Sequence, residues 1–201
     1  VKSGLVPEKY FVGHIELTTH FIAALGLLVY TLWFALRLLV PEQQSIQSPA
    51  LKKFTVALLL LLFVQLCYGG FMAGLRAATV APTWPTINGE WFPASLFNER
   101  GPANLVNNPF MVHFIHRGIA YLIVILIIRW FLSIQKTALS PWLHKTKILP
   151  LVLVLAQVLL GICTVLYSAS ATALVWFGVL HQFTAMLLLV SLVWVLYLVR
   201  K

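Results

Sequence analysis

Five long apolar stretches divide the chain, and polar residues gather between them. A helix needs about 20 mostly apolar residues to cross a bilayer, because each residue advances it by about 1.5 Å and the hydrocarbon core is about 30 Å thick. The five stretches reach this length and cover residues 15–39, 54–75, 112–132, 148–167 and 176–199. The pattern predicts an all-α fold class, a polytopic transmembrane helical bundle with five spans.

Composition agrees with this class. Of the 201 residues, 61% are hydrophobic and 9% are charged, whereas soluble domains carry about 25% charged residues. The net charge of +9 is the one feature that could indicate nucleic acid. The bases lie in short groups at the ends of apolar stretches, however, so they predict the lipid bilayer as partner and no nucleic acid.

Loop charges predict the orientation. The segments after the first and third stretches, together with the C-terminus, contain nine basic residues against one acid, Glu42. These bases are Arg37, Lys52, Lys53, Arg129, Lys136, Lys145, Lys147, Arg200 and Lys201. Basic loops stay on the cytoplasmic or matrix side of a membrane. We therefore expect the N-terminus outside and the C-terminus inside.

The longest connection, residues 76–111, is predicted on the outside. It is rich in Pro, Asn, Gly and aromatic residues. Such a long loop in a compact chain is usually functional, which predicts a cover over a site. The alternative is that Trp84 and Trp91 simply anchor the protein at the membrane surface.

A weak internal repeat links the last four spans. Gln65–Gly69 and Gln157–Gly161 share a QxxxG spacing in the second and fourth spans. His116–Ala120 and His181–Ala185 share an HxxxA spacing in the third and fifth. These spans therefore form two copies of a helix pair, and each Gln needs a partner on another helix. His20 begins a further HxxxA in the first span, with no QxxxG helix before it.

Three histidines lie inside the predicted spans at one depth. His20, His116 and His181 each follow the outer end of a span by about five residues, or roughly 7 Å. An ionisable residue within a span marks a functional site by default. The other three are predicted at a surface or a membrane interface: His14, His113 and His144.

Two imidazoles at matched depth in a four-helix bundle can approach a flat metal macrocycle from its two faces, so His116 and His181 predict a heme site. The alternative for each is a hydrogen bond between helices. No Cys/His spacing supports zinc. Arg76 and Arg117 follow as candidates to hold heme propionates, the alternative for Arg117 being a side chain that reaches the lipid headgroups.

Several ordered motifs resemble those of the heme A synthases, and the resemblance covers nearly the whole chain. The segment Val1–Leu5 resembles the one before the fourth span of that family. The remaining motifs are Gly69-Gly-Phe-Met-Ala-Gly-Leu-Arg-Ala77, Thr83-Trp-Pro85, Gly89-Glu-Trp-Phe-Pro93, Asn108-Pro109, Phe114-Ile-His-Arg-Gly-Ile-Ala-Tyr121, Gln157-Val-Leu-Leu-Gly161 and Leu180-His-Gln182.

The resemblance implies an architecture. Heme A synthases have eight spans in two pseudo-symmetric four-helix halves. By this likeness residues 1–40 hold the last helix of an otherwise absent N-terminal half, 41–53 form an inner linker, and 54–201 form the C-terminal heme-binding half. The chain starts at Val1 without an initiator Met, as a fragment or processed product would. We therefore expect it to be catalytically incomplete by itself.

The resemblance also implies an activity. The family oxidises a methyl substituent of heme O to the formyl group of heme A for cytochrome oxidase, which makes this chain part of an oxidoreductase. His116 and His181 would ligate a heme b (iron), and His20 would be the catalytic or iron-binding histidine for the substrate heme O. Implied partners are the missing half, an electron donor, and heme O synthase or a second copy. The membrane would be the bacterial inner membrane or the mitochondrial inner membrane.

Two other readings remain open from the residues. A bis-histidine electron-transfer cytochrome would use the same matched pair without transforming a substrate. A scaffold or assembly subunit would use the histidines for packing alone. An absorption spectrum separates the scaffold from the other two, and turnover of heme O separates the enzyme from the carrier.

Overall fold

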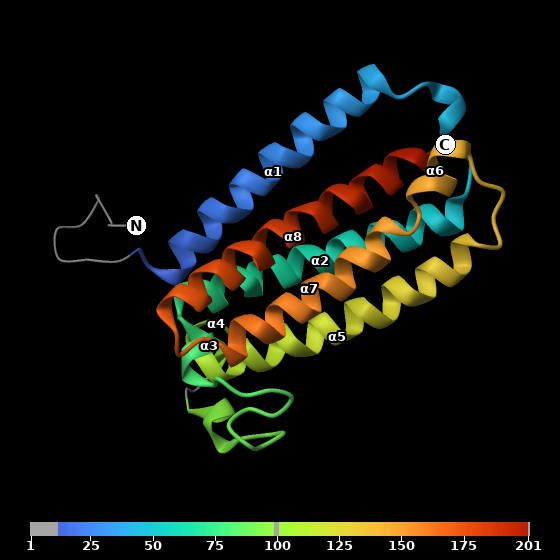
Figure 1. Ribbon diagram of the computed structural model, residues 1–201. Coiled ribbons are helices and arrows are strands. Elements are labelled where there is room, and N and C mark those ends of the chain that lie inside the picture. Colours follow the sequence, from blue (N-terminus) through green and yellow to red (C-terminus); the bar gives the residue numbers. More distant parts are fainter. Residues whose placement is uncertain (1–11, 99–100, 201) are drawn as a thin grey trace.

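The computed structural model describes residues 12–98 and 101–200, so the Val1–Leu5 motif and Lys201 lie outside the described part. Five long helices dominate it (Figure 1). They are α1 (His14–Leu39), α2 (Pro49–Gly74), α5 (Pro109–Ile134), α7 (Leu149–Leu166) and α8 (Ala171–Leu198). Five candidate spans of 26 to 28 residues are long and apolar enough to cross a membrane, the fourth including the short α6 (Pro141–Thr146). The predicted all-α membrane bundle with five spans is confirmed.

Helices α2 and α5 begin before the apolar stretches predicted for them, at Pro49 and Pro109. Pro occupies the first turn of α2, α5 and α6, where its missing N–H costs no hydrogen bond. The side chain of Asn108 accepts hydrogen bonds from the backbone N–H groups of Phe110 and Met111 and so caps α5. The apolar stretches marked only the continuous hydrophobic part of each helix. The first residues of α2 (49–53) and α5 (109–111) were therefore left out of the predicted spans.

Helices α2, α5, α7 and α8 form a closed four-helix ring. In this ring α2 contacts α5 and α8, while α7 contacts the same two helices from the other side. Consequently α5 and α8 lie on one diagonal, and α2 and α7 on the other. Helix α1 lies outside the ring, against α2 and α8 (Figure 1). The QxxxG helices thus share one diagonal and the HxxxA helices share the other.

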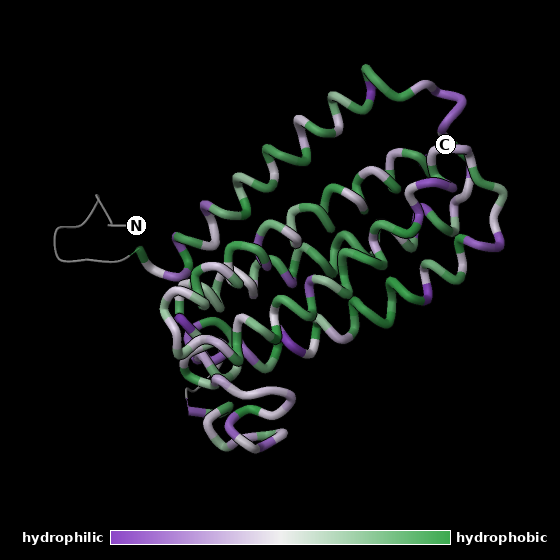
Figure 2. The backbone as a smooth tube through the Cα atoms, viewed as in Figure 1, coloured by the Kyte–Doolittle hydropathy of each residue, from purple (hydrophilic) through white to green (hydrophobic). Residues whose placement is uncertain are grey.

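The two ends of the bundle differ in content. The segment between α2 and α5 lies at the end where α1 begins, and we call this the outer end; it contains α3 (Ala77–Val80), η2 (Ala94–Phe97), η3 (Gly101–Ala103) and α4 (Asn104–Asn107). The opposite, inner end contains η1 (Glu42–Gln44), α6 and the C-terminal end of α8 (Figure 1). Hydrophilic residues gather at both ends and hydrophobic residues line the helices between them (Figure 2).

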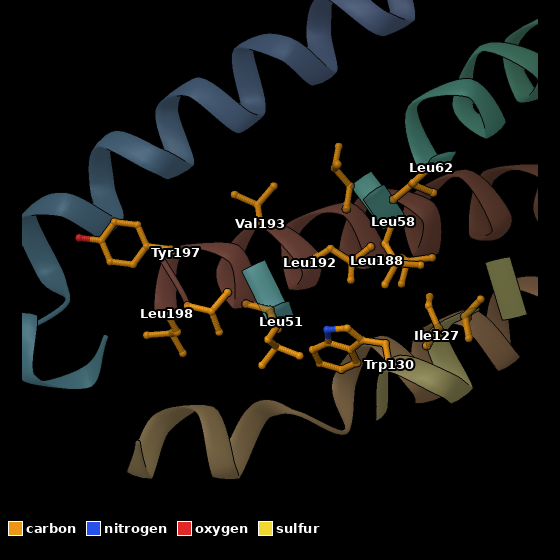
Figure 3. Close-up of a cluster of buried hydrophobic side chains, with 14 of the residues drawn as sticks. Leu51, Leu58, Leu62, Ile127, Trp130, Leu188, Leu192, Val193, Tyr197 and Leu198 are labelled. Atoms are coloured by element: carbon orange, nitrogen blue, oxygen red, sulfur yellow. The ribbon is translucent and has the colours of Figure 1, made fainter. Parts of the chain in front are cut away.

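The core of the ring is packed most densely toward the inner end. Leucines of α2 and α8 surround Trp130 of α5, which is completely buried (Figure 3). Its indole N–H donates to the Thr55 hydroxyl at 3.1 Å, so the buried ring leaves no orphan donor. Large apolar side chains such as Leu60, Ile125 and Leu159 point outward instead. Lipid tails are as apolar as these side chains, so close packing holds the helices together.

Helix α1 packs closely against α2 at two glycines, a contact that was not predicted from the sequence. A Cβ at Gly74 would lie 2.5 Å from the Cα of His14, and one at Gly70 would lie 2.5 Å from the Thr18 hydroxyl oxygen. Neither position therefore tolerates a side chain while α1 is docked. Gly70 and Gly74 form a GxxxG spacing, the pattern that lets membrane helices approach closely.

We expect Gly74→Val to displace the outer end of α1, because the obstructing atom is backbone. Ala23 and Cys67 line one groove between α1 and α2, so Ala23→Cys should crosslink to Cys67 with a short bis-maleimide when Cys163 is replaced by Ala. Crosslinking yield should fall several-fold in the Gly74→Val background. Gly26→Val is the control, since a Cβ there meets nothing within 4 Å. Equal yields in both backgrounds would contradict the docking.

Candidate functional site

The structure brings His116 and His181 together inside the four-helix ring. His116 comes from α5 and His181 from α8, the two helices of one diagonal. Their ring centroids are 6.4 Å apart and the ring planes meet at 67°. Both side chains are partly buried in the protein. Equal depth on two diagonal helices is what places them opposite each other.

His181 is fixed by two hydrogen bonds to one residue of α7. Its Nδ1 lies 3.0 Å from the backbone carbonyl oxygen of Gln157, and its Nε2 lies 3.1 Å from the Gln157 side-chain nitrogen. A carbonyl only accepts and an amide nitrogen only donates. The ring therefore carries its proton on Nδ1 and presents an unprotonated Nε2, which is the atom and protonation state that a metal ion needs.

His116 repeats this arrangement with weaker contacts. Its Nε2 lies 3.4 Å from the side-chain nitrogen of Gln65 on α2. Its Nδ1 is buried and has no hydrogen-bond partner among the residues that the structure describes, and the same holds for the side-chain oxygens of Gln65 and Gln157. The prediction that each glutamine needs a partner on another helix is confirmed. Unpaired buried polar atoms beside two histidines make this spot the candidate site.

The glycine of each QxxxG motif lies against the histidine, and at Gly161 it also makes room for the ring. A Cβ at Gly161 would lie 3.0 Å from Cε1 of His181, and one at Gly69 would lie 3.5 Å from Cε1 of His116. Each glycine is one turn along the helix from the glutamine that contacts the same ring. The repeat therefore has a physical meaning: glutamine binds the histidine, and glycine gives the ring access to the helix.

His113 lies one turn before His116 on α5, and its predicted place at the membrane interface is wrong. The side chain is 1% exposed, and its Nε2 accepts a hydrogen bond of 2.9 Å from Nε of Arg117. Its position near the outer end was read correctly. The segment between α2 and α5 folds over it, and this cover is what removes it from the interface.

Arg117 holds that segment against α5. Its terminal nitrogens donate to the carbonyl oxygens of Thr83 at 2.6 Å, Thr86 at 3.0 Å and Pro85 at 3.2 Å. The guanidinium is therefore directed into the loop. The sequence had predicted heme propionates or lipid headgroups as its partners instead. A second contact supports the same loop, because the Trp84 indole N–H donates to the Tyr121 hydroxyl at 3.0 Å.

The other predicted site residues lie apart from the histidine pair. Arg76 has an exposed side chain and a left-handed backbone conformation, with φ of 51°, where α3 begins. His20 is exposed on α1, which lies outside the ring. His144 is exposed on α6 as expected. None of these placements tests the roles that were predicted for Arg76 and His20.

His14 was predicted to be a surface residue, but in the structure it contacts other residues. It is half-buried, its Nε2 lies 3.1 Å from the Asn107 side-chain oxygen, and its ring meets Phe71 edge-on at 6.0 Å. Asn108 was not predicted to have a role of its own. Its side chain donates to the carbonyl oxygens of Ser95 and Leu96 and so holds the outer segment. Two sequence features could have predicted these contacts: the GxxxG spacing on α2, which indicates close packing of another helix, and the Asn-Pro pair that starts α5.

Within residues 12–98 and 101–200, no three His, Cys, Asp or Glu side chains gather closely enough to hold a metal ion. The paired histidines can therefore supply two ligands and no more. A group that uses them must bring its remaining ligands with it.

The chain is similar to known proteins along most of its length. Residues 1–193 match the COX15-CtaA family, described as cytochrome oxidase assembly protein. The heme A synthase of Flavobacterium psychrophilum is 34% identical over 204 residues, which are 100% of this chain and 58% of that protein. The heme A synthase of Rhizorhabdus wittichii is 36% identical over 185 residues, 91% of this chain and 51% of that protein.

The heme A synthase of Paracoccus denitrificans is 33% identical over 175 residues, 84% of this chain and 46% of that protein. The chain thus spans about half the length of the curated relatives it matches. No solved structure matches it. On the match of nearly its whole length, the chain belongs to the COX15-CtaA family of cytochrome oxidase assembly proteins.

Proposed function

We propose that this chain is the C-terminal part of a heme A synthase and that its four-helix ring holds a heme b between His116 and His181. The observation that carries the proposal is the histidine pair on one diagonal, with ring centroids 6.4 Å apart. Metal–imidazole bonds are about 2.0–2.1 Å and the nitrogen lies about 1.1 Å from its ring centroid, so two rings sharing one metal stand about 6.3 Å apart. The centroid separation in the structure lies near this value, and each Nε2 contacts a glutamine amide that the metal would replace.

Chemistry favours a macrocycle over a bare metal ion. Two protein ligands are too few for a zinc or carboxylate site, whereas a heme would bring four nitrogen ligands of its own and would need only the two histidines from this chain. The unprotonated Nε2 of His181 fits an axial ligand. The amides of Gln65 and Gln157 face the two Nε2 atoms, so binding iron exchanges those hydrogen bonds for bonds to the metal.

The bound iron would supply one-electron redox chemistry. The chain's own residues would set its surroundings: His116 and His181 would bind it, and the backbone carbonyl of Gln157 together with Gly161 would orient His181. Arg117 and Trp84 hold the outer loop against α5, so the loop keeps water from the outer end of the site. Arg76 and Arg117 remain candidates for the propionates, and Arg117 would have to release loop carbonyls to bind them.

Oxidation of heme O would take place beside this half. Helix α1 lies outside the closed ring and exposes His20, which supports assigning residues 1–40 to a second four-helix half of an eight-span protein. Residues 41–53 would link it to 54–201. His20 would then ligate iron or position the substrate, and the reaction would need an electron donor as a partner. Heme O synthase or a second copy would be a further partner.

The test uses full-length protein in membranes supplied with heme O. Extraction and chromatography of the pigment should show heme A, and His20→Ala should abolish it while the low-spin heme b spectrum survives. The 201-residue chain alone should retain heme b and make no heme A. Heme A production by the isolated chain would overturn the assignment of the activity to two halves.

A bis-histidine electron carrier is the second candidate. It is favoured by the pairing of His116 with His181. A heme held by both histidines would have no open position for a substrate. A purified full-length protein with a low-spin heme spectrum and no conversion of heme O would establish the carrier and refute the enzyme. A protein without any heme would refute both.

We propose that the outer end faces the periplasm or the intermembrane space, on the strength of the loop bases. Asn88 and Ala138 are exposed near opposite ends of the bundle. In a background without Cys67 and Cys163, Asn88→Cys should react with a membrane-impermeant maleimide from outside, and Ala138→Cys only after the membrane is opened. Reaction of both from the same side would reverse or refute the topology.

A further inference from the structure

The two histidines are held differently, although the repeat makes their surroundings similar. Nδ1 of His181 donates to the Gln157 carbonyl oxygen at 3.0 Å. Nδ1 of His116 is buried and makes no hydrogen bond of good geometry among the described residues, although the Gln65 backbone lies close to the ring. The side-chain contacts follow the same order, with 3.1 Å from Gln157 to His181 and 3.4 Å from Gln65 to His116.

Gly161 is what lets His181 reach that carbonyl. A Cβ at this position would lie 3.0 Å from Cε1 and 3.4 Å from Nδ1 of His181. Separations this short are rare for a real Cβ, so the ring would have to move away from α7. Moving away lengthens the Nδ1–H···O bond. At Gly69 a Cβ would meet His116 at 3.5 Å, an ordinary contact, and that ring could stay in place.

We propose that Gly161 and the Gln157 carbonyl act as a positioning pair for His181 and make it the stronger electron donor of two inequivalent axial ligands. This rests on the proposed heme b. A ligand histidine that donates its second N–H to a carbonyl becomes a better donor to the metal. Stronger donation stabilises ferric over ferrous iron, so the pair lowers the midpoint potential of the heme.

The experiment compares Ala substitutions in the heme-loaded full-length protein. Gly161→Ala should raise the midpoint potential and shift the low-spin EPR signal, because it weakens donation by His181 and turns its ring. Loss of one hydrogen bond predicts about a tenfold change in the ferric-to-ferrous preference, which is about 59 mV for one electron. Gly69→Ala should shift both far less. Gly118→Ala, where a Cβ meets nothing within 4 Å, should leave both unchanged.

Gln157→Leu separates the backbone from the side chain. It keeps the carbonyl and removes only the amide, so the potential and EPR signal should remain close to those of the parent. If Gly161→Ala matched Gly118→Ala, the proposal would be wrong while the heme site stood. If Gln157→Leu moved the potential and Gly161→Ala did not, the side chain would be the positioning group instead. A parent protein without low-spin heme would refute the proposed function itself.

A measurement on the parent protein needs no variant to fold. In the ferrous, low-spin form the heme is diamagnetic, so proton NMR can detect the axial Nδ1–H groups. A cross-relaxation signal between the His181 Nδ1 proton and the Gly161 Hα protons is expected, since the ring lies against that glycine. Its absence in heme-loaded protein whose His181 resonances are assigned would overturn the proposal.

Discussion

Replacing His181 with alanine is expected to abolish the low-spin heme spectrum of the protein, and replacing His116 is expected to do the same. The two ring centroids lie 6.4 Å apart, and no group of three His, Cys, Asp or Glu side chains that could hold a metal ion occurs among the described residues. Loss of either ring leaves one axial position empty, which converts a low-spin heme to high spin or releases it. Absorption and EPR spectra of purified variants measure the change.

The control for this pair is His144→Ala. His144 is exposed on α6 at the opposite end of the bundle, so its variant should keep the parent spectrum. A circular dichroism spectrum of each variant separates loss of heme from loss of helices. Low-spin signals of parental size and position in both His116→Ala and His181→Ala would show that the heme is ligated elsewhere.

Replacing Arg117 with leucine is expected to release the outer loop from α5. The guanidinium donates to His113 and to three loop carbonyls, and each hydrogen bond to a charged group is worth about 1.5–3 kcal/mol. Leucine removes all four and leaves the buried His113 Nε2 and the part-buried carbonyls of Thr83 and Thr86 without this donor. Chymotrypsin added from the outer side should therefore cut near the exposed Trp91 and Phe92 at least tenfold faster than in the parent.

Two variants define what Arg117 contributes. Arg117→Lys keeps the charge but loses the planar fork that reaches several carbonyls at once, so it should give an intermediate cleavage rate. Arg129→Leu removes an exposed arginine from the inner part of the same helix and should not change the rate. Cleavage of Arg117→Leu at the parental rate would mean that other contacts, such as Trp84 with Tyr121, suffice to hold the loop.

The sequence determined the parts of this protein that follow from length and spacing. A run of apolar residues long enough to cross a bilayer forms a helix almost without alternative, because lipid offers no partner for backbone N–H and C=O groups. Equal distances from the helix ends put His116 and His181 at one depth. The QxxxG and HxxxA spacings identified the helix pairs, since a glutamine in a span needs a partner.

Only the tertiary structure decided how side chains near the outer end are used. His14 and His113 lie at helix ends, where the sequence predicts exposure, and a segment folded over them makes them partly or completely buried. Arg117 has five donors that could serve lipid, propionate or carbonyl, and the position of the loop selects the carbonyls. The difference between His116 and His181 was also invisible in the sequence. It depends on a few tenths of an ångström between a ring and a facing helix, and packing alone sets that distance.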